Sequence, residues 1–313
     1  MTNFGMCFSK SIKEENPLSH IGKKRPTYLE LFTLCENQGW NVFAVSKKTY
    51  QGKGIFNGVW AFNNGEFKQV FEKTKMDLVF DWTNGLEFPP EEDPKMRVVD
   101  SQKFKVFCSN KWEMYLILRQ FMATTYWVGE DNFNLKKILT KIKGDKVVLK
   151  PISGLKGKGI FVGEKNEALK FKFEGKNPHY IAQEFVDTSG GIKGITDGRH
   201  DLRVVVNNKK VVWCHVRTPR PGTYKANVGQ GGSLTEVDYN LVPDKVKKIV
   251  EEVSEIFYKE FDNPLFSVDF GIEKGHPYIF EINDQIGFPL PDAKGREKFL
   301  QELVENFKSK VKK

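Results

Sequence analysis

Two short apolar runs flank a turn in residues 264–284, which read PLFSVDFGIEKGHPYIFEIND. Apolar and other residues alternate in both runs with a period of two, which predicts the two strands of an antiparallel hairpin. This alternation puts Asp269 on one face of the first strand and puts Glu281 and Asn283 together on one face of the second. The hairpin therefore has a polar face as well as an apolar one.

The length of the turn determines which polar side chains lie opposite each other. A loop with three central residues, 274–276, places Asp269 opposite Glu281, whereas a two-residue loop shifts the pairing by one position. Two opposed carboxylates repel each other, so we expect a positive charge between them. Oxygen ligands of this kind suit Mg²⁺, which one or two carboxylates usually hold. The alternative is a sheet with one wet face, on which both acids are simply solvated.

A loop rich in glycine and lysine occupies residues 147–162, VVLKPISGLKGKGIFV. It follows an apolar strand and matches neither of the common phosphate-loop motifs. Its backbone N–H and ammonium groups could fold over a polyphosphate, although a mobile surface turn has a similar composition. Lys150 ends the apolar strand and needs an anion if it is buried, whereas Lys156 and Lys158 could be solvated.

Two arginines lie in the strands expected within residues 200–220, where Arg203 and Arg217 interrupt apolar runs. Strand arginines are often paired with carboxylates, and their forked N–H donors also suit phosphate. Just before them, the apolar run 180–186 contains Gln183 and Glu184 and forms a hinge that could offer backbone groups to a flat ring.

The order of the expected elements predicts a mixed fold. A strand, an amphipathic helix and a second strand open the chain, and Asn64-Gly65 marks a tight hairpin. The first hundred residues therefore predict a small open α/β domain. After residue 110, strands outnumber crossover helices, which favours a largely antiparallel α+β region.

Composition excludes several classes of protein. The 313 residues fit two domains, or one domain with a lobed second, and a hydrophobic content of 39% excludes a disordered chain. The net charge of +9 comes from 49 basic and 40 acidic residues spread along the chain, so an anionic ligand, a nucleic acid and simple solvation all remain open. Four well-separated cysteines indicate neither a disulfide framework nor a zinc site and fit a reducing, cytoplasmic setting. No signal peptide or membrane helix is expected.

An ordered set of motifs resembles the ATP-grasp superfamily. The motifs are SNK (109–111), LKP (149–151) with GKGI (157–160), AQEFV (182–186), HDLRVVV (200–206), VRTPR (216–220) with ANVGQGG (226–232), VDFGI (268–272) and FEIND (280–284). Within the superfamily, the chain is similar to the branch of glutathione synthetase, ribosomal-protein (RimK-like) glutamate ligases and YheC/YheD-like proteins. The resemblance implies a small pre-ATP-grasp α/β domain (1–102), an N-terminal lobe with a phosphate lid (103–182) and a C-terminal lobe with a metal site (183–313).

The resemblance also implies roles for individual residues. Lys111 and Lys150 look like the lysines that hold the ATP phosphates, and Gly154, Lys156, Gly157 and Gly159 lie in the segment similar to the phosphate-covering lid. Gln183, Glu184, Phe185 and Val186 resemble the adenine hinge, with Glu184 or Asp201 as ribose ligands. The catalytic positions would be Arg203, Arg217 and Asn227. Asp269, Glu281 and Asn283 match a metal triad for two Mg²⁺ ions bridged by Glu281, with Mn²⁺ as an alternative.

The implied reaction is an ATP-dependent carboxylate–amine ligation. A substrate carboxylate attacks the γ-phosphate, and an amine captures the resulting acyl phosphate, with release of ADP and phosphate. The substrates would be small molecules or peptides. The alternatives are a small-molecule kinase of the same fold, a nucleotide-binding protein without turnover, and a basic nucleic-acid binder. No aromatic–basic stripe supports the last of these, so no nucleic-acid or membrane partner is expected, and a homo-oligomer is left open.

One basic stretch has no place in this scheme. Residues 19–28, SHIGKKRPTY, precede the first helix and could bind an acidic acceptor. A solvated loop is the alternative.

Overall fold

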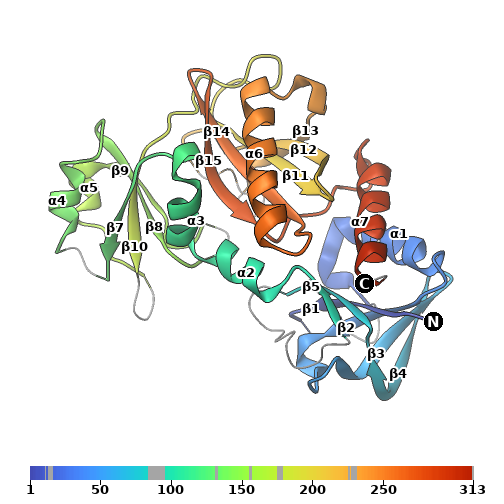
Figure 1. Cartoon of the computed structure of the whole chain (residues 1–313). Coiled ribbons are helices and arrows are strands. Elements are labelled where there is room, and N and C mark those ends of the chain that lie inside the picture. The colour runs from blue at the N-terminus through green and yellow to red at the C-terminus, as the bar shows by residue number, and fades with distance from the viewer. Residues whose placement is uncertain are drawn as a thin grey trace.

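The protein is represented by a computed structural model that describes residues 1–10, 12, 17–83, 96–130, 133–154, 157–174, 179–224, 226 and 231–311. The described residues form three sheets, and the third sheet along the chain lies between the other two (Figure 1). The cleft described below lies between the second and the third sheet.

The first sheet is open and mixed, as the sequence predicts. It contains β1 (Asn3–Phe8), β2 (Asn41–Ser46), β3 (Ile55–Asn63), β4 (Glu66–Lys75), β5 (Leu78–Trp82) and β6 (Arg97–Val99), in the order β4-β3-β2-β1-β5-β6. The central pairs β2-β1, β1-β5 and β5-β6 are parallel, whereas β3 and β4 form the expected hairpin at Asn64-Gly65. Short 3-10 helices precede α1 and follow β2; they are η1 (Ser19–Lys24) and η2 (Lys47–Thr49).

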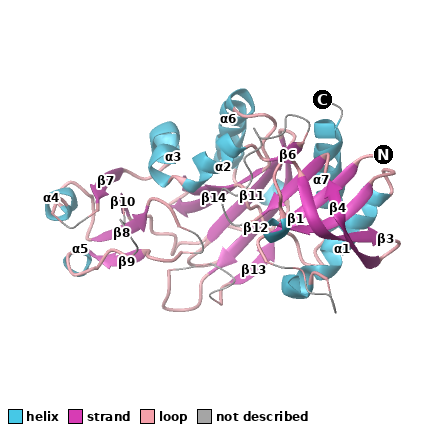
Figure 2. Cartoon of the chain, turned by 90° about the horizontal axis from the view of Figure 1, so that it is seen from below, coloured by secondary structure: helices cyan, strands magenta, loops and turns pink. Residues whose placement is uncertain are grey.

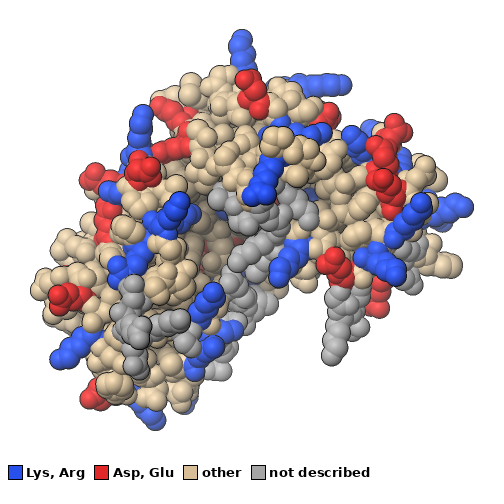
Figure 3. Space-filling model, turned by 180° about the vertical axis from the view of Figure 1, so that it is seen from behind, with Lys and Arg blue, Asp and Glu red and all other residues tan. Residues whose placement is uncertain are grey.

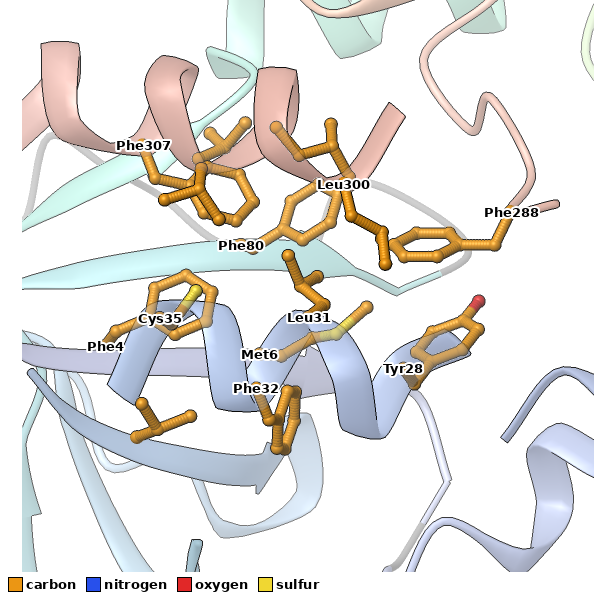
Figure 4. Close-up of a cluster of buried hydrophobic side chains, with 14 of the residues drawn as sticks. Phe4, Met6, Tyr28, Leu31, Phe32, Cys35, Phe80, Phe288, Leu300 and Phe307 are labelled. Atoms are coloured by element: carbon orange, nitrogen blue, oxygen red, sulfur yellow. The ribbon is translucent and has the colours of Figure 1, made fainter. Parts of the chain in front are cut away.

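Helices from the two ends of the chain cover one face of this sheet. They are α1 (Arg25–Glu36) and α7 (Arg296–Val311), whose apolar side chains meet those of β1 and β5 (Figure 4). Phe307 of α7 lies 5.1 Å from both Phe4 and Phe80, measured between ring centroids. The range 183–313, predicted as the C-terminal lobe, therefore also supplies a helix to the core of the first sheet.

The second sheet is small and antiparallel. It contains β7 (Thr125–Gly129), β8 (Lys146–Pro151), β9 (Phe161–Glu164) and β10 (Tyr180–Glu184), in the order β7-β10-β8-β9. Two short helices accompany it, α4 (Leu135–Leu139) and α5 (Lys165–Ala168). Their apolar residues and those of β8 and β10 share one core.

The third sheet is also antiparallel and has five strands. They are β11 (Asp201–Asn207), β12 (Lys210–Thr218), β13 (Ser233–Glu236), β14 (Phe266–Glu273) and β15 (His276–Asn283), in the order β13-β12-β11-β14-β15. The helices α2 (Gln102–Ser109), α3 (Lys111–Leu118) and α6 (Asp244–Glu260) lie along one face, as Figure 2 shows. The 3-10 helices η4 (Arg119–Phe121) and η6 (Tyr239–Leu241) complete the elements. The other face of the sheet carries the polar residues of the candidate site.

β14 and β15 pair in the register that places the carboxylates of Asp269 and Glu281 opposite each other. The predicted three-residue loop between the two strands, however, is wrong. Asp269 pairs with Glu281, and Ser267 pairs with Asn283. The turn nevertheless has two residues, Lys274 and Gly275, both with positive φ as a type I′ turn requires. A β-bulge restores this register. Phe280 is the extra residue on β15, between the pairs Asp269–Glu281 and Phe270–Ile279.

Gly271 makes room for this bulge. A Cβ atom at Gly271 would overlap the ring of Phe280. We therefore expect Gly271→Ala to lower the free energy of unfolding by about 1–3 kcal/mol, because the extra methyl group at this buried position forces the half-buried ring of Phe280 to move. Urea unfolding measures this effect.

Gly190 provides the matched control, because a Cβ atom there meets nothing within 4 Å. Gly190→Ala should leave the free energy of unfolding nearly unchanged. If Gly271→Ala behaves like this control, Phe280 does not need the space above Gly271. Adding Phe280→Leu should recover much of the stability lost in Gly271→Ala.

Candidate active site

A cleft of about 370 Å³ lies between the second and third sheets, and most of the predicted site residues line it. These residues are Lys111, Lys150, Gly157, Gln183, Glu184, Phe185, Val186, Asp201, Arg203, Arg217, Asp269, Glu281 and Asn283. Gly154 lines a smaller pocket beside it, together with Lys111 and Glu281. Segments that are far apart in the sequence thus converge on one cleft.

Two lysines reach the cleft, Lys111 from the start of α3 and Lys150 from β8 of the second sheet. Lys111 begins α3 behind the N-cap Asn110, and its Nζ donates to the Gly154 carbonyl at 3.1 Å and lies 3.0 Å from Glu281 Oε1. Lys150 Nζ donates to Gln183 Oε1 at 2.7 Å. Burial lowers the pKa of Lys150 to about 8, while the nearby carboxylate of Glu281 acts in the opposite direction. The hydrogen-bond partner of this ammonium is a neutral amide, so an anion in the cleft could still compensate its charge.

The centre of the third sheet holds a buried cluster of arginines and acids. Arg203 forms a forked pair with Asp269, Nε to Oδ1 at 2.6 Å and Nη2 to Oδ2 at 2.7 Å, and Arg217 Nη2 lies 2.7 Å from the same Oδ2. Burial alone would raise the pKa of Asp269, but Arg203 and Arg217 outweigh it and hold that pKa well below its usual range. Asp269 is therefore ionised and is the main counter-charge of both arginines.

Asp201 completes this cluster by accepting a hydrogen bond from Arg217 Nη2. Burial, followed by the negative charge of Asp269, raises the pKa of Asp201 to about 6. Asp201 Oδ1 and Arg217 Nε are buried without a hydrogen-bond partner within the described residues. Buried polar atoms normally have partners, so the centre has spare hydrogen-bonding capacity for a ligand.

The three candidate metal ligands differ in their readiness to bind a cation. The side chain of Glu281 is 32% exposed, and among the described residues its ion pair is with Lys111. Asn283 Nδ2 donates to Asp269 Oδ2 at 3.2 Å, which leaves its carbonyl oxygen available. Asp269 Oδ2 already accepts from Arg203, Arg217 and Asn283. The all-oxygen set fits a hard cation such as Mg²⁺, with Glu281 and Asn283 as the accessible ligands.

No group of three or more His, Cys, Asp or Glu side chains gathers as metal ligands within the part of the chain that the structure describes. The candidate set has two carboxylates and one amide, so it does not form a group of that kind.

The inner part of the cleft is apolar and flanks the predicted hinge. Val148, Ile160, Val162 and Phe280 line it beside residues 183–186. The peptide groups of Phe185 and Val186 make no backbone hydrogen bond within the described residues. Two apolar walls with free backbone groups at the end are what a flat heteroaromatic ring needs.

The hinge side chains have structural partners of their own. Gln183 is buried and bonds Lys150 and Thr125, and the carboxylate of Glu184 accepts from the backbone N–H of Lys143 at 3.1 Å. Their backbone can therefore serve a ligand while their side chains stabilise the second sheet.

Several lining residues were not predicted from the sequence. Besides the apolar wall, they are Thr188, Arg199, His200, Pro219, Tyr224, Ala226 and Gln285. Tyr224 packs edge-on against Phe185 at 5.4 Å and lies under the guanidinium of Arg199 at 4.4 Å. Phe280 could have been expected to line the cleft, because it directly precedes the predicted metal ligand Glu281. Strict alternation along the strand instead assigned its side chain to the face of the hairpin opposite Glu281.

Two predicted positions, Lys156 and Asn227, lie outside the described residues. The predicted lid is thus described only in part. Gly159 lies two residues before β9 and has a φ of +68°, and its carbonyl accepts from the Tyr180 hydroxyl at 3.0 Å.

The outer surface of the molecule is less informative than the cleft. On the face seen in Figure 3, Lys and Arg are dispersed among Asp and Glu. In the described segments, no helix combines the length and the apolar character needed to cross a membrane.

Comparison with known proteins agrees with this arrangement of lobes and cleft. A family model described as the ATP-grasp domain matches residues 108–288, more than half of the chain. The chain belongs to the ATP-grasp family, and the predicted fold of a pre-ATP-grasp domain followed by an ATP-grasp fold is confirmed.

Curated relatives are similar at low identity. A probable alpha-L-glutamate ligase 1 of Pseudoalteromonas atlantica is 25% identical over 183 residues, which is 56% of both chains. A probable alpha-L-glutamate ligase of Alkalilimnicola ehrlichii is 27% identical over 117 residues, 36% of both chains. The chain spans between about a third and just over half of the length of these relatives.

Solved structures are similar over the whole chain. D-alanyl-alanine synthetase A from Vibrio cholerae has a TM-score of 0.67 at 13% identity, with 100% of this chain and 99% of that chain covered. The RimK domain ATP-grasp protein from Sphaerobacter thermophilus has a TM-score of 0.64 at 12% identity, with 98% and 99% covered. At these identities the similarity establishes the fold.

Proposed function

We propose that the protein is an ATP-dependent carboxylate–amine ligase that forms an acyl phosphate and acts on an amino acid or a peptide. The observation that carries the proposal is the convergence of Lys111 and Lys150 with Asp269, Glu281 and Asn283 on one cleft. The names of relatives support the class of reaction, since they include glutamate ligases and a D-alanyl-alanine synthetase.

ATP would lie with its adenine between the apolar walls and its phosphates toward the two lysines. The ring would contact Val148, Ile160, Val162 and Phe280, and its polar edge would meet the backbone of residues 184–186. Lys111 and Lys150 would neutralise the phosphates, and the glycine loop 153–159 would cover them. Asp201 and Glu184 remain the candidates for the ribose hydroxyls.

The reaction needs positioning and charge neutralisation rather than a covalent nucleophile. A substrate carboxylate oxygen attacks the γ-phosphorus, and the bond to the β–γ bridging oxygen breaks as ADP leaves. An amine then attacks the acyl carbon, loses a proton and displaces phosphate. Arg217 and Arg203 would stabilise the charge on the oxygens that change partners.

Glu281, Asn283 and one oxygen of Asp269 would hold Mg²⁺, or Mn²⁺ in its place. When bound, the ion would neutralise the terminal phosphates and polarise the γ-phosphate. Two ions bridged by Glu281 are part of the proposal. Arg217 would have to exchange its hydrogen bond to Asp269 for one to a phosphate oxygen. It could do so because it would keep its hydrogen bond to Asp201.

A hydroxamate assay tests the proposed reaction. The protein is incubated with ATP, Mg²⁺, hydroxylamine and a panel of amino acids and short peptides, and hydroxamate and ADP are measured. The ligase predicts both products in equal amounts, and labelled carboxylate oxygen should appear in the released phosphate. A stable phosphorylated product without free phosphate would identify a kinase, and the absence of ADP across the panel would indicate a binding protein without turnover.

The lowered pKa of Lys150 gives the nucleotide affinity a pH dependence. Because the free ammonium loses its proton above about pH 8, binding of ADP should weaken by up to about tenfold per pH unit above that value. The variant Lys150→Arg stays charged and should bind ADP almost equally at pH 7.5 and 9. Calorimetric titration with ADP and Mg²⁺ at these two pH values makes the comparison. Equal pH profiles for the wild type and the variant would exclude Lys150 as the titrating phosphate ligand.

A further inference from the structure

The strand that carries Glu281 and Asn283 lies at the edge of the third sheet. Within the described sheet, β15 therefore pairs with a strand on one side only, which is β14. Asn283 is the last residue of β15 and forms the last pair of the hairpin, with Ser267. The position of the Asn283 side chain thus depends on what holds the residues that follow it.

Asp284 holds the end of this strand from the side that faces away from the cleft. Asn283 and Gln285 line the cleft, whereas Asp284, which lies between them, does not. Asp284 Oδ2 lies 3.8 Å from Lys105 Nζ on α2. Lys105 in turn forms an ion pair of 2.5 Å with Asp81 Oδ2, and the side chains of this pair are almost fully buried. Lys105 therefore joins the residue after Asn283 to β5 of the first sheet.

Gln285 holds the same segment from the cleft side. Its Nε2 donates to the carbonyl oxygen of Thr83 at 3.3 Å and to that of Asp81 at 3.5 Å. The backbone N–H and the hydroxyl of Thr83 donate to Asp81 Oδ1 at 2.9 Å and 2.6 Å, and both residues are buried. The chain at the end of β5 is therefore a well-fixed attachment point for the two residues that follow Asn283.

The neighbouring strand β14 is also attached to the first sheet. Asp100 directly follows β6 and is 3% exposed, and its Oδ1 accepts from the backbone N–H of Leu265 at 2.8 Å. Leu265 directly precedes β14, the strand of Asp269. Both strands of the hairpin with the candidate metal ligands are thus joined to the first domain at the end opposite their turn.

The chemistry of these contacts favours precise positioning over stability alone. Removing Lys105 and Asp81 from water costs free energy, so apolar side chains of similar size would join two domains at least as strongly. Hydrogen bonds and ion pairs, however, have preferred distances and directions. They therefore fix the path of the chain after Asn283 more narrowly than apolar contacts would.

We propose that Lys105 is a positioning residue for the metal site and that it acts together with Asp284 and Gln285. These three residues would hold the end of β15 so that Asn283 can share a cation with the other two candidate metal ligands. The inference rests on the proposed ligase function and adds the first domain to its metal site. Lys105 and Asp284 do not line the cleft, so they would act through Asn283 rather than on the ion itself.

The affinity for ADP with and without a metal ion tests this role in the absence of turnover. The full chain is titrated with ADP by calorimetry, once with saturating Mn²⁺ and once with EDTA, and the ratio of the two affinities is the gain that the metal provides. The wild type should show a clear gain. The double variant Asp284→Asn/Gln285→Met should lose about tenfold of it, because partners that orient metal ligands commonly have effects of this size. Its affinity for ADP in EDTA should be unchanged, which a general loss of structure would not leave intact.

Lys105→Met distinguishes positioning from simple electrostatics by the sign of its effect. Removing a positive charge near the site would by itself strengthen Mn²⁺ binding, whereas a displaced Asn283 weakens it. We therefore expect a smaller gain for Lys105→Met. If this variant does not fold, Gln285→Met alone makes the same distinction, because it changes no charge. Asp292→Asn is the control, since it alters an exposed acid in the same connection, and it should keep the wild-type gain.

Four results would overturn the positioning role. They are a wild type without any gain, a double variant with the full gain, an equal loss of ADP affinity in Mn²⁺ and in EDTA, and a larger gain for Lys105→Met.

The hydroxamate assay separates this inference from the proposed function. If the double variant loses the gain but the wild type forms no hydroxamate, the ligase proposal fails and the positioning role stands. If the wild type forms hydroxamate and the double variant keeps the full gain, the positioning role fails and the ligase proposal stands.

Discussion

Replacing Asp269 by asparagine should lower the free energy of unfolding by roughly 3–5 kcal/mol, because two buried arginines then lose their main counter-charge. Arg203 and Arg217 both contact this carboxylate, and both are nine-tenths buried. Chemical unfolding of the wild type and the variant at pH 7 measures the loss. ATP turnover should fall with it, since the same carboxylate is a candidate metal ligand.

The pH dependence of this loss follows from the direction of the pKa shift. The folded-state pKa of Asp269 is lower than its value of 3.8 in an unfolded chain, so its charge stabilises the protein above about pH 4. That contribution is lost only as the pH falls below 4 toward the folded-state pKa. The difference between wild type and Asp269→Asn should therefore be as large at pH 5 as at pH 7.

Asp201→Asn provides the comparison within the same cluster. Asp201 hydrogen-bonds to one arginine, and burial raises its pKa, so its ionised form is less favourable in the folded protein. We expect a smaller loss of stability than for Asp269→Asn. If the two variants are equally destabilised, or if Asp269→Asn unfolds like the wild type, Asp269 is not the main counter-charge of this centre.

The second large effect is expected from Glu281→Gln. This change keeps the shape of the side chain but removes its charge, and with it the proposed bridging ligand of the metal ions. We expect ATP turnover to fall by about 100-fold or more, and the Mg²⁺ concentration needed for half-maximal turnover to rise. Steady-state ADP release at increasing Mg²⁺ concentration measures both.

Stability and a control variant separate this effect from misfolding. The side chain of Glu281 is partly exposed to the cleft, so Glu281→Gln should keep a Tm close to that of the wild type. Glu251→Gln, which changes an exposed acid on α6, should leave turnover unchanged. Turnover of Glu281→Gln within a few-fold of the wild type, with the same Mg²⁺ dependence, would remove Glu281 from the metal site.

Much of the fold follows from local patterns. Alternation predicted the hairpins at residues 56–70 and 266–283, and helical periodicity predicted α1, α6 and α7. The short elements β7, β13 and α5 and the helix α2 did not appear in the sequence reading. Their runs of four to eight residues are too short for periodicity to distinguish them from loops.

The candidate site was found largely through an ordered set of motifs rather than through any single residue. Lys111 and Glu281 lie more than a hundred residues apart in the sequence, yet both line the same cleft as Lys150. The apolar walls were missed, since Val148, Ile160 and Val162 have the same sequence signal as core residues. Burial against a neighbouring layer and exposure to a cleft look alike in a linear pattern.

The sequence by itself determined the classes of the main elements and the polar face of the hairpin, because side-chain period and turn residues act over a few positions along the chain. Only the tertiary structure decided how β14 and β15 align, because the bulge at Phe280 offsets a two-residue turn and depends on the space above Gly271. It also decided that α7 packs on the first sheet. Such packing is governed by contacts between distant segments, whose partners no local pattern can specify.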